Sequence, residues 1–187
     1  STVSSGVSRV AVFVPLKTDE VVLSRLSSSA SGSGADPKLW WSLIGEMLAR
    51  PQTLSNGGPY PEAVSLARLM EASLSSATNL ATIRSIDIDA LKAMQTENVE
   101  TSILQAKALQ NVDAAVLMLY TVHDSTVQFG ALFLTKTGEG ASYFSGALSI
   151  FGLAEGTREA VHAFVAKKIL VPKAQASKES LASGHAS

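Results

Sequence analysis

The sequence contains no cysteine, and histidine occurs only three times among its 187 residues. Without thiols there is no disulfide, no thiolate nucleophile and no cysteine-ligated zinc site. Three scattered histidines also lack the clustering that transition-metal sites use. We therefore expect no metal and no cofactor. Because disulfides are absent, we expect a cytoplasmic or virion location.

The chain also lacks a strong net charge and a long apolar run. Its formal net charge is -1, which gives no overall attraction to nucleic acid or to an anionic membrane. No apolar run reaches the roughly 20 residues that a membrane-spanning helix needs. Residues 1–6 lack the charged-then-apolar pattern of a signal peptide. We expect neither a transmembrane segment nor a signal peptide.

Three stretches are too polar and too simple in composition to build a core. Residues 1–8 predict a flexible N-terminal arm, residues 27–35 a flexible Ser/Gly loop, and residues 172–187 a polar C-terminal tail. Hydrophobic residues make up 46% of the whole chain, which is enough for one core but not clearly for two. We therefore predict a single α+β domain over residues 9–171.

Three apolar runs lie close together near the end of this domain. Two polar breaks separate them, His123–Ser125 and Thr137–Gly140, and the glycines of the second break can take the positive φ of a tight hairpin. This pattern predicts a three-stranded antiparallel meander over about residues 114–151. The expected fold class is α+β, with a mostly antiparallel sheet built on this meander and amphipathic helices packed on it.

The first of these runs is apolar on both faces of the predicted strand. Val116, Met118 and Tyr120 alternate with Leu117 and Leu119, whereas a strand with one solvated face would alternate apolar and polar residues. Both faces must therefore be covered. Helices of the same chain are the ordinary explanation. The alternative is that a second subunit covers one face.

Asp36 and Pro37 mark the clearest helix start, because Asp suits the N-cap and Pro suits the first helical position. Apolar pairs then recur every four residues as far as Met47 and Leu48, which gives a broad apolar stripe. A second helix is predicted from Pro61.

Weaker signals predict other elements. Arg9–Val14 is a β-branched run stopped by a proline, so we expect an edge strand there. Thr18 or Asp19 can cap a short helix, and residues 97–109 predict a modest amphipathic helix. Thr157 is expected to cap the final helix.

Two groups of residues contain the amino-acid types that catalytic or metal sites use. His123, Asp124 and Ser125 are consecutive and so cannot converge as a triad, which leaves a polar hairpin turn. Asp87 and Asp89 could share one strand face for acid/base chemistry or Mg²⁺ binding. A strand end followed by a helix cap explains this pair more simply. We therefore predict no catalytic residue.

Basic residues near the end of the chain are candidates for nucleic-acid contact. Lysines over a helix end and tail could contact a phosphate backbone, with RNA as the partner. The ordinary explanation is that lysine complements the dipole at a helix C-terminus. No arginine-rich or aromatic-interleaved run accompanies them, so nothing predicts base recognition. The candidates are Lys136, Lys167, Lys168, Lys173 and Lys178.

The adjacent tryptophans Trp40 and Trp41 are candidates for self-association. On a helix they point about 100° apart, so both cannot face the same core. Trp40 belongs to the apolar stripe, which leaves Trp41 at its margin or available to a neighbouring molecule.

Together these features favour a non-catalytic structural protein that associates with itself as a homo-oligomer. A viral coat, nucleocapsid or matrix-type subunit is the best example. The alternative is a regulatory or adaptor domain that binds a small ligand or peptide against its sheet. An enzyme ranks last, because no residue pattern supplies an activated nucleophile or a poised base.

Overall fold

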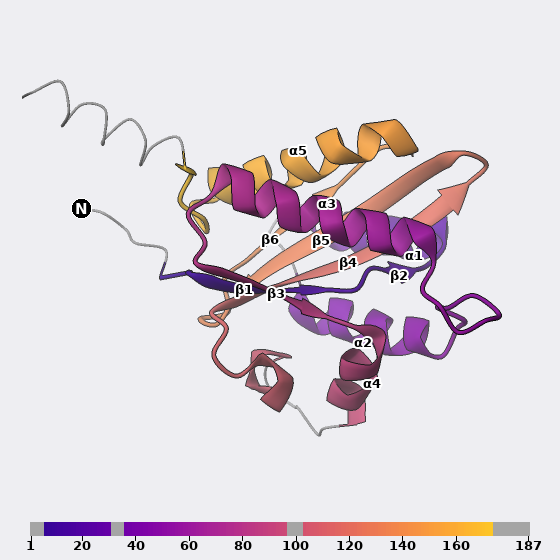
Figure 1. Ribbon diagram of the computed structural model, residues 1–187, viewed down its shortest axis with the longest axis horizontal. Coiled ribbons are helices and arrows are strands. Elements are labelled where there is room, and N and C mark those ends of the chain that lie inside the picture. Colours follow the sequence, from indigo (N-terminus) through magenta and orange to yellow (C-terminus); the bar gives the residue numbers. More distant parts are fainter. Residues whose placement is uncertain (1–5, 31–35, 97–102, 174–187) are drawn as a thin grey trace, which may run out of the picture.

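The computed structural model of the chain describes residues 6–30, 36–96 and 103–173 (Figure 1). Most of the predicted N-terminal arm, more than half of the predicted Ser/Gly loop and nearly all of the predicted tail lie outside these residues.

The described residues form an α+β fold in which helices cover a mixed β-sheet (Figure 1). The elements in chain order are β1 (Arg9–Phe13), β2 (Leu16–Lys17), α1 (Glu20–Ala30), α2 (Pro37–Leu48), α3 (Pro61–Ala77), β3 (Thr82–Ile86), α4 (Ile88–Thr96), the 3₁₀ turns η1 (Ile103–Gln105) and η2 (Lys107–Leu109), β4 (Ala114–His123), β5 (Thr126–Thr135), β6 (Gly140–Phe144), β7 (Leu148–Ser149), the 3₁₀ turn η3 (Ile150–Gly152) and α5 (Leu153–Ala166).

The sheet has the strand order β3-β1-β4-β5-β6, with β2 also paired to β4 and β7 to β5. The β3–β1, β1–β4 and β2–β4 pairs are parallel, whereas β4–β5, β5–β6 and β5–β7 are antiparallel. The prediction of a mostly antiparallel sheet is therefore wrong, and the sheet is mixed. Parallel neighbours need long crossover connections, which the helical segments between β1 and β4 supply.

The first strand lies inside the sheet, so the prediction of an edge strand is wrong. Arg9 is paired with Thr82 on β3, and Val10 with Ala114 on β4. Pro15 follows the end of β1. Its missing N–H therefore removes no hydrogen bond from the β1 ladder, and the proline gives no information about the edge.

The third apolar run does not form the continuous meander strand predicted up to residue 151. β6 ends at Phe144, a break follows, and only Leu148 and Ser149 return to pair with β5. At this break Ser145 N still donates to Phe129 O at 2.9 Å, while its Oγ accepts from Phe129 N at 2.9 Å and donates to Gly146 O at 2.8 Å. The hydroxyl thereby replaces the backbone oxygen that a continuous strand would offer to Phe129 N.

Helices of the chain itself cover both faces of the sheet (Figure 1). α3 and α5 pack on the face that carries Val116, Met118 and Tyr120. α1, α2 and α4 pack on the face that carries Leu117 and Leu119. Intramolecular packing therefore explains why β4 is apolar on both sides, and no second subunit is needed there.

Side-chain caps define the starts of the N-terminal helices as predicted. Asp36 Oδ1 accepts hydrogen bonds from Lys38 N at 3.1 Å and Leu39 N at 3.4 Å, and Pro37 is the first residue of α2. Asp19 Oδ1 accepts from Val22 N at 2.9 Å at the start of α1.

Three local predictions are wrong. Residues 27–30 continue α1 instead of beginning the flexible loop. In the predicted helix 97–109, the described part consists of two 3₁₀ turns, η1 and η2. Thr157 does not cap α5, which begins four residues earlier, because its buried hydroxyl bonds Ser73 Oγ at 2.8 Å and joins α5 to α3.

Candidate functional site

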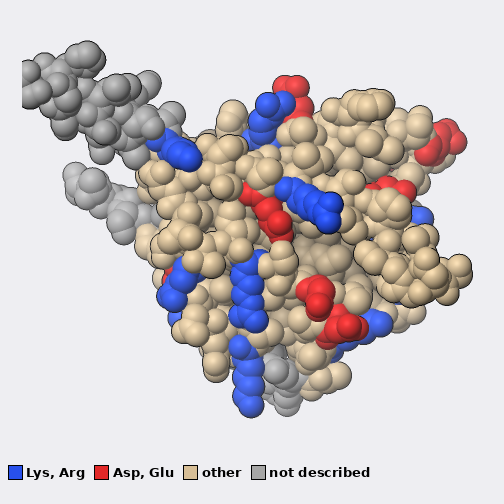
Figure 2. Space-filling model, viewed as in Figure 1, with Lys and Arg blue, Asp and Glu red and all other residues tan. Residues whose placement is uncertain are grey.

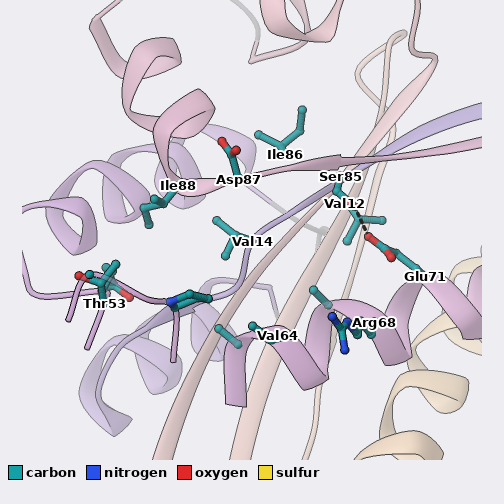
Figure 3. Close-up of a pocket in the computed structure, with 15 residues that line it drawn as sticks. Val12, Val14, Thr53, Val64, Arg68, Glu71, Ser85, Ile86, Asp87 and Ile88 are labelled. Carbon is teal, nitrogen blue, oxygen red and sulfur yellow. Dashed lines mark hydrogen bonds between the residues drawn. The ribbon is translucent and has the colours of Figure 1, made fainter. Parts of the chain in front are cut away.

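An apolar groove lies between helix α3 and the edge of the sheet formed by β3 and β1 (Figure 3). It encloses about 360 Å³. Val12 and Val14 contribute apolar side chains from the sheet side, and Val64 and Ala67 contribute from α3. These α3 side chains are short, so the helix leaves space beside the edge strand instead of filling it. We refer to this cavity as the α3–β3 groove.

The loop that closes one end of the groove is held in place by Gln52. Its Oε1 accepts a hydrogen bond from Lys17 N at 2.7 Å, and its Nε2 donates to Lys17 O at 2.9 Å and Met47 O at 3.0 Å. Farther along the loop, Gly57 has φ 87°, a conformation that glycine adopts without strain. Since hydrogen bonds from the Gln52 side chain to backbone atoms fix this loop, the groove is preformed.

Charged residues at the rim of the groove already have structural roles. Glu71 accepts a hydrogen bond from Ser85 Oγ and so links α3 to β3 (Figure 3). Asp87 Oδ1 accepts from Ala90 N at 2.8 Å and caps α4. Arg68 is exposed on the α3 side. Figure 2 shows this side of the molecule, where acidic and basic side chains border an uncharged recess. This arrangement suits an apolar ligand rather than acid/base chemistry.

An exposed apolar tip lies at the start of α5. Phe151 is 97% exposed and Ile150 is 58% exposed, and both belong to η3. Ser149 fixes this turn, because its Oγ accepts a hydrogen bond from Gly152 N at 3.2 Å and its backbone is paired with Thr126 on β5. We refer to this feature as the Ile150–Phe151 tip. An almost fully exposed aromatic side chain on a fixed backbone turn is typical of an interface.

The structure places the two predicted tryptophans in different surroundings. Trp40 is 1% exposed and packs against Phe144, with the ring centroids 6.1 Å apart. Trp41 is half-buried, and its ring meets Phe13 edge-on at 6.4 Å. Trp40 therefore offers no surface to a partner. Self-association through Trp41 stays a prediction.

The described lysine candidates are all exposed, and their segments lie toward one end of the molecule (Figure 1). Lys136 follows β5, while Lys167, Lys168 and Lys173 follow or end α5. Lys178 lies outside the described residues. Nucleic-acid contact stays a prediction for all five.

Asp113 ties the N-terminal segment to this end of the molecule. Partial burial raises the pKa of its carboxyl. Hydrogen bonds from Ser8 N at 3.0 Å and Arg9 N at 2.9 Å outweigh that effect, so the net pKa lies below the ordinary value. The carboxylate therefore acts as a structural clamp.

The remaining candidates have the simple explanations that the sequence favoured. Asp124 has φ 54° in the hairpin turn after His123, and both side chains are largely exposed. Asp87 follows a strand and caps a helix. Over residues 6–30, 36–96 and 103–173, no three His, Asp or Glu side chains are grouped so as to hold a metal ion. Within the same ranges no helix is long and apolar enough to cross a membrane.

Sequence reasoning missed both the α3–β3 groove and the Ile150–Phe151 tip. The groove forms between segments that are far apart in the chain, so no local pattern marks it. The tip was included in a predicted strand. The flanking Gly146 and Gly152, with Ser149 as a turn residue, were the available signal that this strand is interrupted.

A comparison of the chain with protein-family models, curated proteins and solved structures finds no match. Function therefore has to be inferred from the groove, the tip and the surrounding residues.

Proposed function

We propose that this protein is a non-catalytic structural protein that works by associating with copies of itself. The observation that carries the proposal is the Ile150–Phe151 tip, with Phe151 97% exposed. Transferring a phenylalanine side chain from water to an apolar site is worth about 1.5–3 kcal/mol. Because a hydrogen bond already holds the backbone of this turn, docking costs rotamer entropy of the two side chains but little backbone entropy.

The tip replaces the sheet as the proposed contact surface. The sheet faces are covered by the chain's own helices and are not available to a partner. A coat, nucleocapsid or matrix-type subunit is the kind of structural protein we propose, because its work consists of packing against its own copies. The roles of Asp87, Glu71 and Asp113 as caps and clamps support a structural protein over an enzyme.

Sedimentation velocity over about a hundredfold range of protein concentration tests the proposal. We expect the sedimentation coefficient to rise with concentration for the parent protein and to stay at the monomer value for Phe151→Ser. Val21→Ser is the matched control, because Val21 is 74% exposed on α1 and lies outside the tip. A parent protein that stays monomeric at the highest concentration refutes self-association.

A second candidate function is an adaptor that binds an apolar peptide or small ligand in the α3–β3 groove. Its volume of about 360 Å³ favours this function, because ligand pockets usually measure about 300–1,000 Å³. Titration with N-acetyl-phenylalanine amide, followed by NMR, tests it. We expect shifts confined to groove residues such as Val64 and Ala67. Unchanged spectra at millimolar ligand would count against this function.

A further inference from the structure

We propose that the α3–β3 groove of one molecule receives the Ile150–Phe151 tip of a second copy of this chain. This inference rests on the proposed self-association and identifies the two surfaces that meet. It predicts a head-to-tail contact in which each molecule offers one tip and one groove.

The tip and the groove lie toward opposite edges of the sheet. β3, which borders the groove, is the first strand in the order β3-β1-β4-β5-β6. The tip directly follows β7, which pairs with β5 near the other end of that order. A three-residue turn cannot cross the intervening strands, so the tip cannot fill the groove of its own molecule. A second copy can bring the two surfaces together.

The two surfaces match in chemistry and in rigidity. The groove presents aliphatic side chains, including Val12, Val14 and Val64, beside an open cavity of about 360 Å³ (Figure 3). The tip presents one aromatic and one aliphatic side chain in succession. Gln52 holds the groove loop and Ser149 holds the backbone of the tip, so neither backbone must be ordered when the contact forms.

Charges beside the two surfaces also fit each other. The groove rim carries Arg68 together with the acidic Glu71 and Asp87. Beside the tip, α5 exposes both Glu155 and Arg158. Because each surface carries both signs, Glu155 facing Arg68 and Arg158 facing the acidic residues would orient the docking of the apolar tip. Because the two surfaces differ, their pairing produces rings or open chains of subunits rather than a two-fold dimer.

A mixing experiment tests the pairing. Phe151→Ser removes the tip and keeps the groove, while Ala67→Trp fills the groove and keeps the tip. Val64→Lys is a second groove variant, in case the tryptophan disturbs α3, and circular dichroism confirms that each variant is folded. Alone, each variant should associate about 30-fold more weakly than the parent, as for loss of an interface hot spot.

An equimolar mixture of Phe151→Ser with a groove variant should form 1:1 dimers in sedimentation velocity, at concentrations where each variant alone is monomeric. These dimers should not form larger assemblies, because the unoccupied tip carries Phe151→Ser and the unoccupied groove carries the groove substitution. Phe151→Ser mixed with itself is the control and should stay monomeric.

Each other outcome overturns a specific part of the inference. If both groove variants associate as strongly as the parent, the tip docks elsewhere, and the groove pairing fails while self-association stands. If all single variants are monomeric and the mixture gives no dimer, the contact is not head-to-tail. If the parent itself never associates, both the pairing and the proposed function fail.

Discussion

The contact between α5 and the sheet can be tested by placing a methyl group on Gly156. A Cβ at this position would lie 2.6 Å from Leu148 Cδ1 and 3.1 Å from Phe129 Cε1. Carbon atoms normally pack at about 3.5–4.0 Å, so both neighbours must move. Leu148 is half-buried and can rotate, but the Phe129 ring is fully buried and has little room.

Two opposing effects decide the result of Gly156→Ala. Alanine is favoured over glycine in a helix interior by about 1 kcal/mol. Overpacking a filled core costs about 1–3 kcal/mol. Because two contacts are too short and one neighbour is trapped, we expect overpacking to dominate. The free energy of unfolding should fall by about 1–2 kcal/mol.

Gly45→Ala is the matched control, because Gly45 also lies inside a helix. Its added Cβ would meet only the Gln95 side chain, with Oε1 at 3.0 Å, the far end of a side chain that can move away. The higher helix propensity of alanine should dominate there, so the free energy of unfolding should rise by up to about 1 kcal/mol. Urea unfolding followed by circular dichroism measures both variants. Thermal midpoints should move in opposite directions, by about 2–4 °C per kcal/mol. If Gly156→Ala stabilises the protein as Gly45→Ala does, α5 does not approach the sheet as closely as described.

Three further predictions concern single groups. Tyr120→Phe should raise the free energy of unfolding by about 1 kcal/mol in urea titrations, because the buried Tyr120 hydroxyl has no hydrogen-bond partner among the described residues; a loss of stability would indicate a partner for it. Lys168→Gly should raise the free energy of unfolding by about 1 kcal/mol, because Lys168 has φ 61° just after the end of α5, where glycine is unstrained. An unchanged urea midpoint would contradict this. Asp113→Ala should lower the free energy of unfolding by about 1–2 kcal/mol at neutral pH. This difference in stability from the parent should disappear as the pH falls through the lowered pKa of Asp113, because the native carboxylate is then protonated. A difference that persists in acid would exclude the clamp role.

Elements defined by adjacent residues could be predicted from the sequence. The start of α2 follows from Asp36 and Pro37, whose capping geometry depends on the next three residues alone. The turn at Asp124 follows from polar residues between two apolar runs. Thr157 misled the prediction because its hydroxyl bonds Ser73 on another helix, a partner that local sequence cannot reveal.

Features that depend on distant segments could not be predicted. β1 is parallel to both its neighbours, and nothing near Arg9 specifies Thr82 or Ala114 as its partners. The α3–β3 groove has the same origin, because it exists only once α3 and β3 lie side by side. The apolar character of β4 was visible, but the sequence did not show which helices would cover it.

The position of β1 also determines when the molecule can fold during synthesis. Both strands that flank β1 belong to segments that leave the ribosome long after it, β3 first and β4 much later. Until β4 emerges, Val10 and Val12 lack most of their native surroundings and can form wrong contacts. Pairing between such distant segments also slows the search for the native topology. We therefore expect a nascent chain stalled before residue 114 to remain sensitive to protease along its entire emerged length.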